Sequence, residues 1–186
     1  MLSEKLKENT KLNHQALEKK LIARMRTLKS KEDYAKFIAL FYSYFGGLEL
    51  AINKYLDLSQ LPDYGRRRKT SALADDLSLL GEKLPVLYAK SALPKINNHC
   101  QAFGALYVIE GSTLGGRVIC KMLSEQMDMT GFSEMLFFNG YGDQTATMWQ
   151  IFKQSMDQPV YKLKHEMIIE SANHTFIKFG NCFENN

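Results

Sequence analysis

Apolar side chains recur along this chain at the spacing of an α-helix, and this periodicity constrains the fold more than any other feature of the sequence. Within residues 34–48 the period is close to 3.6, in the set Tyr34, Phe37, Ile38, Phe41, Tyr44, Phe45 and Leu48. No segment alternates apolar and polar residues as a half-buried strand does, and there is no internal repeat. Because 186 residues with 45% hydrophobic side chains suffice for one core, the sequence predicts a single all-α domain over residues 1–186. Its architecture is expected to be an irregular bundle of about seven or eight helices.

The same pattern, together with capping signals, places the helices along the chain. Helices are predicted over residues 2–28, 34–58, 73–80, 85–94, 97–127, 145–156 and 157–183. Ser30 heads a capping signal, and the paired glycines Gly46 and Gly47 predict a bend in the second helix. Gly81 is expected to end the third helix and Asp157 to begin the last one.

The formal net charge is +4, part of which comes from one run of basic residues, Arg66, Arg67, Arg68 and Lys69. A run of charges is most often exposed, so we interpret this one as a solvated loop in preference to a docking patch for an acidic partner. The small net charge does not indicate a protein that binds nucleic acid.

Three cysteines, Cys100, Cys120 and Cys182, are odd in number and far apart, so they predict neither a disulfide framework nor a metal site. They are typical of a reducing compartment. The N-terminus lacks the apolar stretch of a signal peptide, and no run of about 18 apolar residues indicates a membrane helix. We therefore expect a cytoplasmic protein without membrane insertion.

A first group of polar residues lies near the N-terminus, in the segment KENTKLNHQALE. Lys7, Lys11, His14 and Glu18 are spaced by four, three and four residues, which places them along one face of a helix. A neutral imidazole is a good iron ligand when a carboxylate holds its other nitrogen, and the ammonium groups suit the carboxylates of a flat anionic ligand. The alternative is that His14 is a surface histidine and the lysines only solvate the helix.

A second group consists of glycines in the segment GALYVIEGSTLGGRV. Gly104, Gly111 and Gly115 are spaced by seven and four residues and share one face of a helix, and Gly116 adjoins them. A face without side chains inside an apolar helix indicates close approach of another group to the backbone. That group is either a planar ligand or a neighbouring helix, and a kink is a further alternative. No Gly-Lys-Ser/Thr ending follows, which excludes a phosphate loop of that type.

The remaining histidines, His99, His165 and His174, form no metal-binding pair such as HxxxH. His99 is predicted near the start of the glycine-rich helix, where a polar residue needs no special role. His174 is expected to be packed or at the surface of the last helix. None of the three is selected as a ligand.

The segments KENTKLNHQALE and EGSTLGGRV, with their spacing along the chain, resemble the proximal and distal helix motifs of the haem oxygenase family. The last segment, IIESANHTFIKFGNCF, looks like the closing helix of that family. The resemblance implies that His14 is the proximal iron ligand and that Glu18 supports it. It also implies that Lys7 and Lys11 lie near the haem propionates.

On the distal side, the resemblance implies that Gly111, Gly115 and Gly116 form the catalytic wall, where the helix bends over the haem and leaves room for dioxygen. Many family members carry an aspartate directly after the first of these glycines, whereas this chain has Ser112. The basic residue that the closing helix offers to a propionate has no single match here.

The implied function is the oxygen-dependent cleavage of haem to biliverdin, carbon monoxide and ferrous iron, with haem as both cofactor and substrate. Electrons are expected from a separate reductase or ferredoxin, because the chain has no flavin or nicotinamide fingerprint. The first alternative is a carrier or sensor of the same fold that binds haem without turnover. The second is a helical bundle that binds no haem and holds another small molecule or a protein partner.

Overall fold

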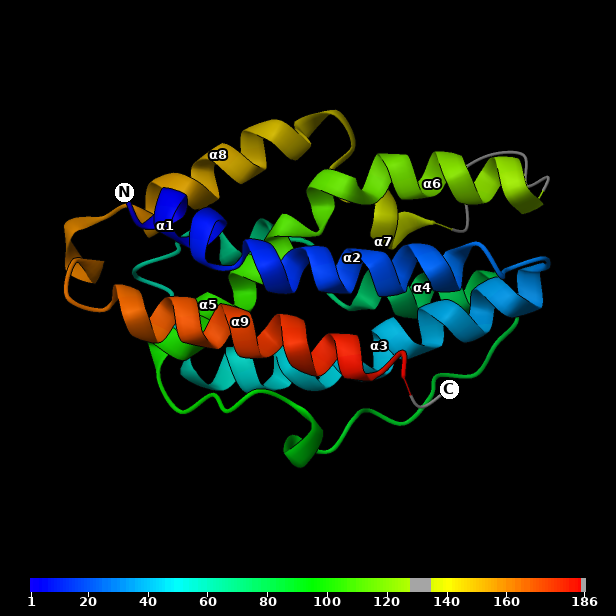
Figure 1. The fold of residues 1–186 in the computed structure, drawn as a ribbon, viewed down its shortest axis with the longest axis horizontal. Coiled ribbons are helices and arrows are strands. Elements are labelled where there is room, and N and C mark those ends of the chain that lie inside the picture. The colour runs from blue at the N-terminus through cyan, green and yellow to red at the C-terminus, as the bar shows by residue number, and fades with distance from the viewer. Residues whose placement is uncertain (128–134, 185–186) are drawn as a thin grey trace.

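The computed structural model describes residues 1–127 and 135–184, and within these ranges the chain is helical with no strand. The α-helices are α1 Leu2–Asn9, α2 Lys11–Met25, α3 Lys31–Tyr55, α4 Ser71–Leu79, α5 His99–Gly111, α6 Thr113–Met127, α7 Leu136–Asn139, α8 Thr145–Met156 and α9 His165–Asn181 (Figure 1). Short 3₁₀ turns cover Tyr64–Arg66, Lys90–Ala92, Gly142–Gln144 and Pro159–Tyr161. The all-α fold predicted from the periodicity is confirmed.

Helix α3 is the central apolar element of the fold. Its start is capped by the Ser30 hydroxyl, which accepts a hydrogen bond from the backbone N–H of Asp33 at 3.1 Å. By length and mean hydropathy, 1.3 over its best window, α3 is apolar enough to cross a membrane, but 56% of that window is buried inside the fold. It packs on α4 and α5, so its apolar character is that of a core helix.

The paired glycines of α3 serve close packing and do not interrupt the helix. A Cβ atom on Gly47 would lie 3.0 Å from the carbonyl oxygen of Tyr88, and one on Gly46 would meet the side chain of Leu87. The backbone N–H of Tyr88 also donates to the carbonyl of Ser43 at 2.9 Å. The glycines therefore let the extended segment after α4 lie against α3.

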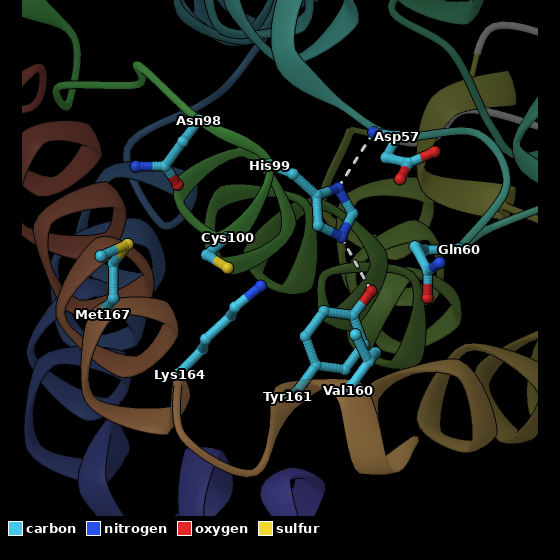
Figure 2. Close-up of a pocket in the computed structure, with 9 residues that line it drawn as sticks. All are labelled: Asp57, Gln60, Asn98, His99, Cys100, Val160, Tyr161, Lys164 and Met167. Atoms are coloured by element: carbon cyan, nitrogen blue, oxygen red, sulfur yellow. Dashed lines mark hydrogen bonds between the residues drawn. The ribbon is translucent and has the colours of Figure 1, made fainter.

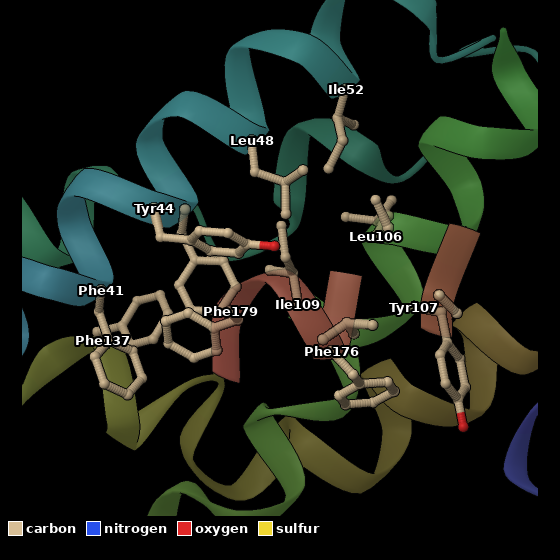
Figure 3. Packing of buried hydrophobic residues seen from close by; sticks show 14 of the residues in the cluster. Phe41, Tyr44, Leu48, Ile52, Leu106, Tyr107, Ile109, Phe137, Phe176 and Phe179 are labelled. Atoms are coloured by element: carbon tan, nitrogen blue, oxygen red, sulfur yellow. The ribbon is translucent and has the colours of Figure 1, made fainter. Parts of the chain in front are cut away.

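Aromatic rings from three parts of the chain form the centre of the core (Figure 3). Phe41 of α3 meets Phe179 of α9 edge to face, with ring centroids 4.9 Å apart, and Phe137 of α7 at 6.2 Å. Tyr44 stacks on Phe179 at 4.8 Å and donates its hydroxyl to the carbonyl of Thr175 at 3.0 Å. Each buried ring contributes about 1.5–3 kcal/mol through burial, so this cluster fixes α3, α7 and α9 to one another.

Helices α5 and α9 pack closely at Gly104, where a Cβ atom would overlap the carbonyl oxygen of Ile168. The Ser171 hydroxyl donates to the carbonyl of Gln101 at 2.7 Å across the same contact. Gly104 therefore belongs to helix packing, which separates it from the other glycines of its predicted face.

Several predicted boundaries differ from the structure. Helices over residues 73–80 and 145–156 are found as α4 and α8, and Gly81 follows α4 with φ +77°. The segment 85–94 holds only a 3₁₀ turn, and the last helix begins at His165. Asp157 does not cap that helix. Its carboxylate accepts from the backbone N–H and the hydroxyl of Ser3, at 2.8 and 2.6 Å, and so satisfies the first turn of α1.

The predicted first helix, residues 2–28, is in fact two helices divided at Thr10 (Figure 1). The Thr10 hydroxyl donates to the carbonyl of Leu6, one turn back, at 2.7 Å. A side chain that competes for this carbonyl bends a helix, and Thr10 is buried, so the division comes from a local bond in a packed position. The apolar periodicity continues across the division, which is why the sequence pattern did not reveal it.

Candidate functional site

His14 lies on α2 with 51% of its side chain exposed. Its ring meets the edge of Phe176 on α9, with centroids 5.4 Å apart and planes at 81°. Nδ1 is 3.5 Å from Oε2 of Glu18. The other ring nitrogen, Nε2, has no hydrogen-bond partner among the described residues, so it is available to a ligand.

Lys7 and Lys11 do not share one continuous helix with each other, because Lys7 belongs to α1 and Lys11 begins α2. Both side chains are exposed. Neither forms an ion pair with another described residue. The single polar line predicted from spacing is thus divided after Lys7, while Lys11, His14 and Glu18 keep their relation along α2.

Burial raises the pKa of Tyr107 and the Thr10 side chain opposes that rise, so the start of α2 lies near α5. One helical turn beyond Thr10 is His14, and one turn beyond Tyr107 is Gly111. His14 and Gly111 therefore each lie one turn along the chain from one of these two neighbouring residues.

The glycines of the EGSTLGGRV segment divide into two kinds. A Cβ atom on Gly115 would meet nothing within 4 Å, and one on Gly111 would meet only the Trp149 ring at 3.9 Å. A Cβ atom on Gly116, in contrast, would overlap the carbonyl of Phe138. Gly111 and Gly115 leave open space beside the backbone, whereas Gly116 allows close contact between α6 and α7, so its assignment to the ligand face stays a prediction.

Ser112 is the residue between α5 and α6. Its hydroxyl donates to the carbonyl of Ile109 at 2.7 Å and accepts from the Arg68 guanidinium at 2.7 Å. The Thr113 hydroxyl likewise donates to the carbonyl of Glu110 at 2.7 Å. These bonds turn two consecutive hydroxyls back on the preceding turn and account for the division of the helix at this point.

The basic run at 66–69 is not a solvated loop throughout, which corrects the sequence interpretation. Arg66 is exposed, but Arg67 is 2% exposed and pairs with Glu110 and Asp63, each at 2.6 Å. Burial lowers the pKa of Arg67, but the two carboxylates more than offset this and hold the pKa above its ordinary value. Burial lowers the pKa of Arg68 to about 10, so this side chain is still protonated at neutral pH.

His99, which was not selected from the sequence, joins three segments beside a cavity of about 340 Å³ (Figure 2). Its Nδ1 accepts from the backbone N–H of Asp57 at 3.0 Å, so the proton is on Nε2, which lies 2.8 Å from the Tyr161 hydroxyl. Burial lowers the pKa of His99. The neutral ring therefore holds the start of α5 to the end of α3, while His174 is exposed on α9 as expected.

No group of three or more His, Cys, Asp or Glu side chains within the described ranges is placed to hold a metal ion. Iron bound through His14 alone must bring its other ligands with it, as a porphyrin ring does. The half-exposed imidazole with a free Nε2 and the open space at Gly111 and Gly115 fit a flat, iron-containing group. The residues present are compatible with haem.

Comparison with known sequences identifies the family of this chain. The sequence profile of the family described as Heme oxygenase matches residues 1–185. A protein of Xanthomonas campestris named heme oxygenase is 27% identical over 152 residues, which cover 81% of this chain and 88% of that protein.

Solved structures share the fold. The haem oxygenase of Leptospira interrogans matches with a TM-score of 0.79 at 18% identity, covering 100% of this chain and 99% of that one. The NO- and CO-bound haem oxygenase of Neisseria meningitidis gives 0.79 at 22% identity, covering 99% and 90%. The haem oxygenase of the cyanobacterium Synechocystis, in complex with haem, gives 0.72 at 20% identity, covering 98% and 90%.

The fold and the site define a protein that is all-helical within the described ranges, with a half-exposed histidine on α2 and a helix division at α5–α6 flanked by glycines. Because the family profile spans almost the whole chain, the chain belongs to the haem oxygenase family.

Proposed function

We propose that this chain binds haem through Nε2 of His14 and cleaves it with dioxygen to biliverdin, carbon monoxide and ferrous iron. The observation that carries the proposal is the half-exposed His14 imidazole, which lies 3.5 Å from the Glu18 carboxylate through Nδ1 and leaves Nε2 open to a ligand. Haem is in this scheme both cofactor and substrate, and it supplies the iron on which dioxygen is reduced.

In the proposed site, residues of α1 and α2 hold the haem. Nε2 of His14 is the metal ligand, and the Glu18 carboxylate, 3.5 Å from Nδ1, favours the tautomer with its proton on Nδ1. The exposed ammonium groups of Lys7 and Lys11 meet the propionates. These roles agree with the lack of other ion-pair partners for both lysines among the described residues.

Gly111 and Gly115 form the opposite wall in the proposed site. With no side chains there, the ring can approach the α5–α6 backbone and still leave room for a small diatomic molecule. The wall carries no acid–base side chain of its own at these positions, so proton delivery falls to ordered water. Ser112 is held by Ile109 and Arg68 and contributes to the shape of the wall.

Electrons come from a separate reductase or ferredoxin in this proposal, and the protein acts in the cytoplasm. The chain has no dinucleotide-binding fingerprint, and its described residues form no sheet on which such a site is built. A basic, exposed N-terminal helix surface suits an acidic donor.

Two measurements test the proposal in sequence. Titration of the purified chain with hemin should shift and sharpen the Soret band at one equivalent. Addition of ascorbate or a ferredoxin system under air should then replace the Soret band with biliverdin absorbance. A stable Soret band without bilin would favour a haem carrier or sensor, and the absence of any Soret shift would exclude haem as the ligand.

A further inference from the structure

The loop before α4 is bonded to the α5–α6 division through the guanidinium of Arg68. Arg68 donates from Nη2 to the carbonyl of Ile109 at 2.8 Å and to the Ser112 hydroxyl at 2.7 Å. From Nη1 it donates to the carbonyl of Phe137 on α7 at 2.8 Å, and the guanidinium lies 3.7 Å from the centroid of the Phe137 ring. A single planar group thus binds α5, the division and α7 together.

A second set of bonds holds Arg68 itself in place. Its backbone N–H donates to the Tyr141 hydroxyl at 2.9 Å, and that hydroxyl in turn donates to the Glu110 carboxylate at 2.9 Å. Glu110 is 1% exposed and also accepts from Arg67 at 2.6 Å. Buried charges are tolerated when they are paired and hydrogen-bonded in this way, and the result is a rigid support.

The α5–α6 division needs hydrogen-bond donors from outside the helix. The last carbonyls of a helix have no partner within the helix, and at the division the carbonyl of Ile109 is shared between the Ser112 hydroxyl and Arg68. All these bonds reach the division from the side of Arg68 and α7. Within the described residues, Gly115 has no neighbour within 4 Å of its Cβ position, so the backbone there is open.

We propose that Arg68 is a positioning residue of the haem site, which sets the height and tilt of the Gly111–Gly115 face relative to His14. This rests on the proposed function, in that the bare glycine face is taken to be the wall beside the ring. Lysine cannot take its place, because one ammonium group cannot reach three acceptors in the plane of a fork. The Ser112 hydroxyl is one of those acceptors and acts through Arg68.

The test compares Arg68→Lys with Arg66→Lys, an exposed arginine of the same loop. Amide hydrogen exchange of the ligand-free protein should become about tenfold faster over residues 109–117 in Arg68→Lys, since the loss of one or two hydrogen bonds has about this effect. Amides of α3 and α9 should keep their rates, and Arg66→Lys should match the wild type throughout.

With hemin bound, Arg68→Lys should keep the Soret maximum of the histidine-ligated complex, because His14 is untouched. Hemin should dissociate about tenfold faster, and turnover should fall with it. Ser112→Ala removes one of three acceptors and should give a smaller change of the same kind. If Arg68→Met is also made and fails to fold, the lysine and alanine variants still give the result.

Unchanged exchange at residues 109–117 in Arg68→Lys would overturn the proposal. So would a uniform rise in exchange over the whole chain, which would mean that Arg68 only stabilises the fold. Because exchange is measured without haem, a wild-type chain that does not bind hemin would refute the proposed function and leave the local effect of Arg68 to be seen separately.

Discussion

Nδ1 of His14 lies 3.5 Å from Oε2 of Glu18, one turn further along α2, and the two side chains are 51% and 54% exposed. The pair is therefore open to solvent and to a ligand on the same side of the helix. A contact of this length is weak by itself, and it becomes a firm hydrogen bond only if the ring is fixed through its other nitrogen. The exposure of both residues makes them suitable for substitution without damage to the fold.

His14→Ala should abolish the histidine-ligated Soret band and the formation of biliverdin. The unfolding free energy should change by less than about 0.5 kcal/mol, because the residue is half exposed. Added imidazole should partly restore the band, since only the ligand nitrogen has been removed. His174→Ala, at an exposed position on α9, is the control. Full activity of His14→Ala would remove His14 from the site.

Glu18→Gln should keep hemin binding and lower the affinity by about tenfold, as loss of a group that orients a ligand does. The ferric complex should also show a weaker iron–histidine bond by resonance Raman spectroscopy, because a neutral amide polarises Nδ1–H less than a carboxylate. Glu8→Gln, on the exposed surface of α1, should behave as the wild type. Equal spectra for the two variants would mean that Glu18 only solvates α2.

Lys7→Ala and Lys11→Ala should each weaken hemin affinity by no more than about fivefold, because exposed charge pairs are weak. The double variant should have a larger effect on orientation: without the two ammonium groups the ring can rotate, and the product should become a mixture of biliverdin isomers. Chromatography of the extracted bilins measures this. An unchanged isomer ratio would assign both lysines to the solvated surface.

Gly115→Ala and Gly116→Ala should change stability in opposite directions although the residues are neighbours. Alanine at 115 enters open space and should raise the unfolding free energy by up to about 1 kcal/mol, while it weakens hemin binding. Alanine at 116 overlaps the carbonyl of Phe138 and should lower stability by more than about 1 kcal/mol. Urea unfolding of the two ligand-free variants and the wild type measures both changes in stability. If alanine at 115 leaves hemin affinity unchanged, Gly115 does not face the ligand.

The neutral state of His99 should make stability depend on pH. Its pKa in the folded protein is below 6.5, chiefly through burial, so its contribution is fully present above pH 6.5 and is lost as the pH falls through the folded value. The Asp57 charge opposes this shift and Lys164 adds to it. His165, whose pKa burial also lowers, acts in the same direction.

The measurement compares urea unfolding of the wild type and His99→Asn from pH 8 to pH 5. This range spans the ordinary histidine pKa of about 6.5. Asparagine offers an oxygen where Nδ1 lies and does not titrate, so the variant should lose less stability at low pH than the wild type. Parallel pH profiles would assign the acid sensitivity to other groups.

Local patterns were sufficient for much of the fold. The periodicity placed α8 over 145–156 as found, and the Ser30 cap of α3 was readable because capping involves residues close in sequence. The division at Thr10 was not readable, since it depends on a hydroxyl that bonds to Leu6 in a buried position, and burial is set by segments far away along the chain.

The candidate site was only partly predictable for the same reason. Spacing selected His14 and Glu18, which the structure keeps together on α2. It gave no sign that Arg67 pairs with Glu110, because a charge run has the same sequence whether it is solvated or buried, and the partner is 43 positions away. Gly116 packs against α7 and Gly115 does not. The periodicity of α6 alone cannot show this difference, because it contains no information on where α7 lies.

The helix that carries His14 depends for its place on a helix far away along the chain. Asn13 donates to Asn173 at 2.7 Å, and α2 packs chiefly on α9. During synthesis α2 is made before α9 and lacks this packing partner until α9 has emerged from the ribosome. The surface that carries His14 is therefore completed by a segment made long after it.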